Sequence, residues 1–334
     1  LLGVGGRQLY KAETPGPMKD SQLTPRITET AKGLWEVYAF ISVLCFFAFH
    51  FAGMTWFDAL MHMFSTMGLG GFSSHDASFG FWNSPAIEVV TIAFMLVAGI
   101  NFGTHFTALR ARSPAAYVRD TEAGMFLLVT LASCAGIAAF LYAKGTYASF
   151  GEALRFASFN VISIATTTGF ANTDYNQWPL FAPLWMLFLC CFASCSGSTG
   201  GGIKMVRAIL LYKQVNREYN KLLHPRAVAP AKIGGQVIEN KIIFAVLAFM
   251  FVYVSSVVAM TLVMVASGLD LTTAFSAVVA SINNTGPGLH KVGPATTYAV
   301  LTDFQTWVCT FAMLLGRLEL FTLLIIFTSA FWRQ

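Results

Sequence analysis

The amino-acid sequence predicts an all-α polytopic membrane protein built from a repeated helix–loop–helix unit. Hydrophobic residues make up 56% of the 334 residues and charged residues only 11%, whereas about 25% of a soluble domain is charged. Apolar runs of roughly 20 residues mark membrane spans, and the sequence contains six. A glycine pattern recurs between them, which indicates that one unit is used three times. The runs are approximately Val37–Phe57, Pro85–Leu109, Met125–Ala143, Pro179–Cys195, Ile242–Ser267 and Val300–Trp332.

In each copy of the glycine pattern, an alanine precedes the key glycine by twelve residues. The second copy follows the segment Gly151–Ile164, which is too short and too polar to span a bilayer and must therefore dip into it and return. We expect similar short helices at Phe57–Met67 and Asp270–Asn283. The three copies, with their alanine–glycine pairs, are Phe64–Ser73 (Ala59 and Gly71), Asn160–Asp174 (Ala157 and Gly169) and Val279–Gly288 (Ala274 and Gly286).

These features divide the chain into three units and two connecting segments. The inner helix of the middle unit should break at Gly197–Gly202, because consecutive glycines disfavour a helix. The last apolar run is long enough to be tilted, bent or interrupted. The sequence starts with Leu1 in a polar stretch, so we expect its beginning to be missing. The divisions are a cytoplasmic connection (1–33), a pore repeat (34–112), a pore repeat with a broken inner helix (113–217), a cytoplasmic loop (218–240) and a pore repeat (241–334).

Lysine and arginine are concentrated before the first apolar run and after the second and fourth runs. Basic loops stay in the cytoplasm, so the three glycine motifs should enter from outside. The net charge of +5 follows from this topology, and no nucleic-acid partner is implied. All six cysteines lie in apolar runs and are interpreted as small buried hydrophobes.

A short helix followed by a returning segment of Thr, Asn and Gly suits the selection of a dehydrated cation. Rings of backbone carbonyls can replace the water shell of potassium, and glycine adopts the dihedral angles that aim carbonyls at an axis. The hydroxyl groups of Thr167 and Thr168 can support or bind an ion. The alternative is three ordinary extracellular turns. No catalytic constellation is present, so we do not expect an enzyme.

Three stretches resemble the signatures of the TrkH/KtrB superfamily of potassium transporters, with bacterial TrkH the most similar branch. The resemblance implies four helix–pore-loop–helix repeats around one potassium-channel-like pore, of which this chain holds three, so the first repeat would be absent. The stretches are Leu2-Gly-Val-Gly-Gly to Met18, Cys195-Ser-Gly-Ser-Thr-Gly-Gly-Gly-Ile-Lys204 and Leu315-Gly-Arg-Leu-Glu-Leu-Phe-Thr322.

The resemblance assigns the potassium-binding oxygens to each key glycine and the two residues before it. Backbone carbonyls must supply most of the coordination, because only some of these residues carry hydroxyl groups. No organic cofactor is expected. The predicted potassium-binding residues are Leu69, Gly70 and Gly71, then Thr167, Thr168 and Gly169, and then Asn284, Thr285 and Gly286.

The resemblance also implies a gate below the filter, formed by the glycine loop and Arg317. The loop is not a phosphate-binding loop, because its spacing is wrong and an apolar run precedes it; a structural kink is the alternative. A charge within a span usually faces a cavity or a partner, so Arg317 either blocks the pore or forms a structural ion pair. Glu319 should have a separate partner. The gate residues are Gly197, Ser198, Thr199, Gly200, Gly201, Gly202 and Arg317.

Other polar residues have two interpretations each. Asn101 and His105 form an interhelical hydrogen-bonded pair or line the ion path. Asp58 and Glu152 enrich cations at the outer mouth or favour helix N-termini.

The sequence therefore predicts potassium uptake across the bacterial cytoplasmic (inner) membrane, driven by a membrane potential worth about 2.3 kcal/mol per charge per 100 mV. The alternatives are a proton- or sodium-coupled symporter on the same scaffold and a non-transporting membrane scaffold. The resemblance implies a homodimer in the lipid bilayer and a cytosolic nucleotide-binding subunit of the TrkA type. Lys213–Lys232 is the candidate contact for that subunit, or else an ordinary positive-inside loop.

Overall fold

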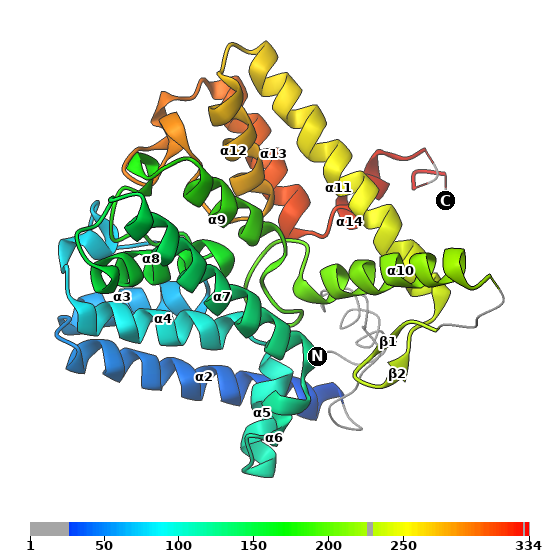
Figure 1. Cartoon of the computed structure of the whole chain (residues 1–334), viewed down its shortest axis with the longest axis horizontal. Coiled ribbons are helices and arrows are strands. Elements are labelled where there is room, and N and C mark those ends of the chain that lie inside the picture. Colours follow the sequence, from blue (N-terminus) through cyan, green and yellow to red (C-terminus); the bar gives the residue numbers. More distant parts are fainter. Residues whose placement is uncertain (1–26, 226–229, 330, 334) are drawn as a thin grey trace.

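The computed structural model describes residues 27–225, 230–329 and 331–333, and these residues are almost entirely helical (Figure 1). Three of the described helices are long and apolar enough to cross a membrane, or up to five if each of two bent pairs counts as one span. The first sequence signature, which ends at Met18, lies outside the described residues. The predicted connection 1–33 is described only from residue 27, where the first helix already begins.

The first series of helices follows the predicted long–short–long order. The short helix α3 begins at Thr55, whose hydroxyl accepts a hydrogen bond from the backbone N–H of Asp58 (3.1 Å) and so caps it. The long helix α2 contacts α3, α4 and α5. The elements are α2 (Ile27–Phe51), α3 (Trp56–Met67), η1 (Ser78–Phe81), α4 (Pro85–Gly99), α5 (Phe102–Ala111) and α6 (Ala115–Arg119).

The expectation of one continuous span over Pro85–Leu109 is wrong. The chain turns by 95° between α4 and α5, and α5 and α6 project from the rest of the molecule (Figure 1). The Asn101 side chain caps α5 by accepting from the Gly103 N–H at 2.8 Å. The backbone at the break bonds to a distant segment: Gly99 O accepts from Cys195 N and Phe102 N donates to Gly197 O, each at 3.1 Å.

The second series provides the centre of the core. Helix α8 is buried along its whole C-terminal half, because α7, α4 and α9 pack around it. A non-helical stretch separates α9 from α10 at the predicted glycine break, and α10 then runs away from the core (Figure 1). The elements are α7 (Thr121–Ala143), α8 (Phe150–Ala165), η2 (Tyr175–Gln177), α9 (Phe181–Phe192) and α10 (Met205–Leu223).

A small hairpin, β1 (Lys232–Ile233) and β2 (Gln236–Val237), lies beside α10. A separate apolar cluster joins α10 to the long helix α11 through residues that include Leu210, Ile238 and Ile243. The third series ends in a pair of helices bent by 111°, so the last apolar run is interrupted. Its elements are α11 (Asn240–Ala266), α12 (Leu271–Ile282), η3 (His290–Val292), η4 (Tyr298–Val300), α13 (Asp303–Arg317), α14 (Phe321–Leu324) and η5 (Ile325–Phe327).

Candidate functional site

The short helices α3, α8 and α12 end in the same backbone geometry. Each is capped at its start by a side chain, from Thr55, Ser149 and Asp270 respectively. The alanines twelve residues before the key glycines are all fully buried. After each helix, three backbone N–H groups bond back to its last turns at equivalent positions. These bonds are Gly68–Phe64, Leu69–Thr66 and Gly70–Ser65; Thr166–Ile162, Thr167–Ile164 and Thr168–Ser163; and Asn283–Val279, Asn284–Ser281 and Thr285–Ala280.

The segments that follow alternate between ordinary and left-handed backbone. We name residues 69–71, 167–169 and 284–286 the candidate filter segments. The first residue of each has a positive φ, at 49° for Leu69, 60° for Thr167 and 55° for Asn284. The glycines that close the segments have φ values of 71°, 91° and 98°. Left-handed conformations are rare outside glycine, so their recurrence at matched positions indicates one geometry imposed on three sequences.

The candidate filter segments touch one another in chain order. A Cβ atom added to Gly71 would lie 2.1 Å from the carbonyl oxygen of Thr168, and one added to Gly169 would lie 2.1 Å from that of Thr285. Both positions therefore require the absence of a side chain. A Cβ atom on Gly286 would meet nothing within 4 Å. The first segment thus contacts the second and the second contacts the third, but the space beside Gly286 is open.

The hydroxyl groups of the second segment are used within the protein. The Thr168 hydroxyl pairs with that of Thr166 (2.7 Å), and the Thr167 hydroxyl accepts from the backbone N–H of Gly201 (2.7 Å). In contrast, the buried Thr285 hydroxyl has no hydrogen-bond partner among the described residues. The Thr167 hydroxyl therefore contacts Gly201, and the Thr168 hydroxyl contacts the end of α8.

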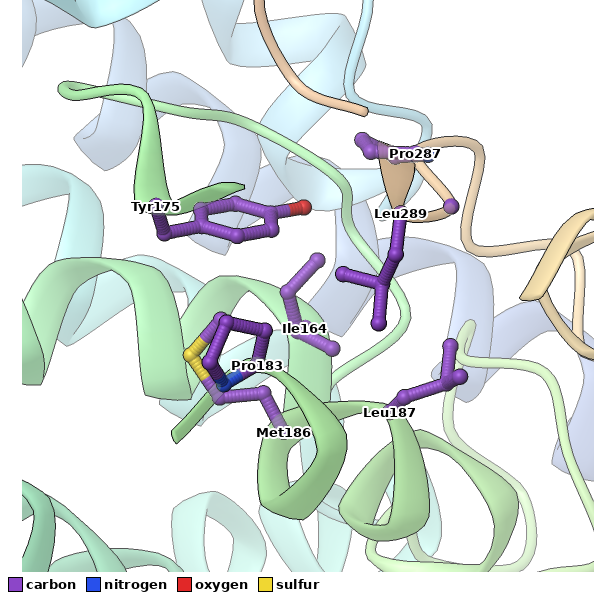
Figure 2. A pocket seen from close by; sticks show the side chains of 8 residues that line it. Ile164, Tyr175, Pro183, Met186, Leu187, Pro287 and Leu289 are labelled. Carbon is purple, nitrogen blue, oxygen red and sulfur yellow. The ribbon is translucent and has the colours of Figure 1, made fainter. Parts of the chain in front are cut away.

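A shallow apolar pocket, too narrow to hold a water molecule, lies near the second and third candidate filter segments (Figure 2). Figure 2 shows the Tyr175 ring and Leu289 on either side of Ile164, with side chains of α9 below them. The pocket has no charged lining residue, so it has the character of a packing gap rather than an ion path. It is lined by Ile164, Tyr175, Pro183, Met186, Leu187, Pro287, Gly288 and Leu289.

The glycine loop 197–202, which we name the candidate gate loop, contacts the base of all three segments. The Thr199 hydroxyl donates to the carbonyl of Met67 (2.9 Å), two residues before the first segment. Gly201 donates to Thr167 in the second segment. Near the third, a Cβ atom on Gly201 would lie 2.1 Å from the carbonyl oxygen of Asn283. The candidate gate loop therefore lies against all three segments.

Basic side chains meet the carbonyls of the candidate gate loop. Arg317, the last residue of α13, reaches the carbonyl oxygen of Thr199 with its Nη1 at 3.5 Å. Lys204 is buried and its Nζ donates to the carbonyl of Gly200. Glu319 has a different partner from Arg317, because it pairs with Arg207 at 3.0 Å. The separate partners expected for Arg317 and Glu319 are thus observed.

The sequence reasoning missed two basic residues of this site. Lys204 received no role, and Arg207 was counted as an ordinary charge of a cytoplasmic loop, yet it is buried and lies over the Phe249 ring at 4.0 Å. Lys204 could have been noticed from the sequence, because it is a charged residue between the apolar residues Ile203 and Met205, which follow three glycines.

Of the polar residues given two interpretations above, Asn101, His105 and Asp58 are hydrogen-bonded within the fold. His105 contacts the Tyr117 hydroxyl (2.8 Å) and the carbonyl of Val97 (2.9 Å), and Asn101 caps α5 rather than pairing with His105. Burial, the largest influence, would raise the pKa of Asp58, but hydrogen bonds from Ser74 and Thr55 and the nearby His75 hold it below its usual value. Glu152 lies in the first turn of α8.

No group of three or more metal-ligating side chains of His, Cys, Asp or Glu occurs among the described residues. The six cysteines are free, and five of them are buried.

Comparisons with known proteins identify relatives along the whole chain. A family model named TrkH and described as "Cation transport protein" matches residues 1–333. The "Trk system potassium uptake protein TrkH" of Salmonella typhimurium is 45% identical over 334 residues, which are 100% of this chain and 69% of that protein. The protein of the same name from Halomonas elongata is 47% identical over 335 residues, which cover 100% of this chain and 68% of that one.

A solved structure is similar as well. The crystal structure of the potassium transporter TrkH from Vibrio parahaemolyticus superimposes with a TM-score of 0.87 at 42% sequence identity. The match covers 93% of this chain and 66% of that one. The chain thus spans about two thirds of the length of these relatives.

Proposed function

Because this chain belongs to the TrkH family of cation transport proteins, we propose that it forms most of a pore for potassium uptake across the bacterial cytoplasmic membrane. The family is one of transporters rather than enzymes. The observation that carries the proposal is the matched backbone of the three candidate filter segments, with left-handed residues at equivalent positions. Such a backbone presents carbonyl oxygens that replace the hydration shell of potassium.

We propose that the three series of helices, at 34–112, 113–217 and 241–334, are three sectors around this pore. Gly71 and Gly169 each lie against the next segment, whereas Gly286 faces open space. A fourth sector seated beside Gly286 would close the ring. We propose conduction for the ring that such a sector would complete.

The candidate gate loop and Arg317 would close the pore on its inner side. The loop contacts the second segment and the residues that precede the first and third segments, and the Arg317 guanidinium reaches the Thr199 carbonyl at 3.5 Å. A fixed positive charge below the filter repels a permeating cation. Displacement of the loop would open the path, and the membrane potential would then drive uptake without chemistry in this chain.

The partners follow from the same family membership. We propose a homodimer in the lipid bilayer and a cytosolic nucleotide-binding subunit of the TrkA type, with Lys213–Lys232 as its contact. This range holds most of α10 and leads into the hairpin, which project together from the core (Figure 1). A coupled symporter and a non-transporting scaffold remain the alternatives, and neither gains support from a particular contact.

The test is potassium uptake by the full-length protein carrying Gly169→Ser, in a bacterial host that depends on it for potassium. The new side chain would start 2.1 Å from the carbonyl oxygen of Thr285, so we expect lost discrimination of potassium from sodium with expression intact. The control is Gly145→Ser, because Gly145 has a similar φ of 70° but no atom within 4 Å of an added Cβ. Unaltered selectivity in Gly169→Ser would refute the filter assignment.

A further inference from the structure

One carboxylate oxygen joins the two ends of the candidate gate loop. Glu122 lies in the first turn of α7, and its Oε1 accepts hydrogen bonds from the backbone N–H groups of Ser196 (2.7 Å) and Val206 (2.9 Å). Ser196 directly precedes the loop, and Val206 lies in the first turn of α10, just after it. The stretch between these two amides contains the whole loop.

The backbone of Glu122 is itself held in place by the side chain of Asp120. Asp120 caps α7 by accepting from the backbone N–H groups of Glu122 (3.0 Å) and Ala123 (3.2 Å). The second carboxylate oxygen of Asp120 accepts from the Thr104 hydroxyl of α5 at 2.6 Å. The start of α7 is therefore fixed to α5, so Glu122 can hold the loop ends against a stationary part of the fold.

The Val206 bond links the loop to a helix that leaves the core. Helix α10 extends from this point to Leu223 and packs on the hairpin and α11 through the separate apolar cluster around Leu210. A movement of α10 along its axis must therefore either break the bond to Glu122 or strain the loop. Glu122 is thus one of two ties at the start of α10, beside the Met205 N–H, which donates to the Ser194 carbonyl at 2.8 Å.

We propose that Glu122 is a positioning residue that latches the candidate gate loop beneath the filter by holding both of its ends. Withdrawal of α10 would remove Val206 from Glu122 and free the loop. Calling the freed state conductive rests on the proposed function, whereas the latch itself does not. The latch depends on the reach of the side chain and on its acceptor oxygen, and not on its charge.

Two conservative substitutions separate reach from charge. Glu122→Gln keeps an oxygen at the same position and removes the charge. Glu122→Asp keeps the charge but withdraws the oxygen by the length of one carbon–carbon bond, ~1.5 Å, so that it no longer meets both amides. Glu36→Asp is the matched control, because Glu36 forms an exposed ion pair with Lys32 on α2.

The readout is the reaction rate of a cysteine introduced in the loop by Ser198→Cys. The full-length protein is labelled with a small charged thiol reagent in inverted membrane vesicles, and the protein with Ser198 intact gives the background. We expect Glu122→Asp to accelerate labelling about fivefold, the factor that corresponds to losing one hydrogen bond of ordinary strength. Glu122→Gln and Glu36→Asp should label at the parental rate.

Either of two results would overturn the latch: a parental labelling rate in Glu122→Asp, or equal acceleration by Gln and Asp, which would assign the effect to charge. Potassium uptake is measured on the same vesicle preparations. If labelling responds as expected but even the parental protein transports no potassium, the proposed function fails while the latch stands.

Discussion

Substitution of Gly201 tests whether the candidate gate loop closes the pore. A Cβ atom at this position would lie 2.1 Å from the carbonyl oxygen of Asn283, whereas ordinary contacts begin at 3.4 Å. Either the loop or the third segment must therefore move by 3.4 − 2.1 = 1.3 Å. Asn283 is held by four bonds: its N–H and its Nδ2 donate to the Val279 carbonyl, its Nδ2 also donates to the Cys191 Sγ, and Tyr253 donates to its Oδ1. The loop should therefore be the part that moves.

Displacement of the loop has a cost that can be estimated from its own contacts. The Gly201 N–H would lose its bond to the Thr167 hydroxyl, which contributes about 1 kcal/mol. That loss alone raises the population of the displaced loop about fivefold. Gly201→Ala should therefore increase basal potassium uptake several-fold while discrimination against sodium persists, as measured by uptake in membrane vesicles.

Gly124→Ala is the control for Gly201→Ala, because an added Cβ at Gly124 meets nothing within 4 Å. Parental uptake by a well-expressed Gly201→Ala protein would refute the gate. Loss of selectivity would show instead that the third segment moved, and that the third segment is less rigid than the loop.

Three further predictions concern charge and stability. Arg317→Gln removes the cation at the Thr199 carbonyl and should raise basal uptake; parental uptake in a folded Arg317→Gln protein would contradict the pore role. Arg155→Ala should lower the unfolding free energy by about 3 kcal/mol in detergent melts, because it leaves Glu88 buried and unpaired after loss of contacts at 2.7 and 2.8 Å; a much smaller shift would mean that water reaches Glu88. Because the pKa of Asp58 is depressed by folding, its stabilisation is complete above the ordinary value of 3.8 and is lost as pH falls below it. Asp58→Asn should therefore weaken the fall of the melting temperature with decreasing pH. An unchanged pH dependence would count against a depressed pKa of Asp58.

The sequence was informative where periodic spacing controls the structure. The alanine–glycine spacing placed the short helices correctly: Gly151–Ile164 was expected and α8 spans Phe150–Ala165. The break after Cys195 was also predicted, because consecutive glycines carry a local cost that needs no tertiary partner.

Features that depend on distant partners were not predictable. The bend at Asn101 is fixed by backbone bonds to Cys195 and Gly197, which no local pattern reveals. No sequence pattern singles out Glu122, because its partner Val206 is 84 residues away. Arg207 was misassigned for the same reason, since its partner Glu319 is 112 residues away.

Helix α10 has the proportions of a lever arm. Its 19 residues, at a rise of 1.5 Å each, give an arm of about 28 Å, with Glu122 near one end and Leu223 at the other. A tilt of about 6° moves the far end by roughly 3 Å but moves a residue one turn from the pivot by only about 0.6 Å. Tilting thus dissipates motion before it reaches the loop, whereas a push along the axis is delivered undiminished. A regulator bound near the Leu223 end of α10 would therefore act most efficiently by pulling or pushing along the helix axis rather than by tilting the helix.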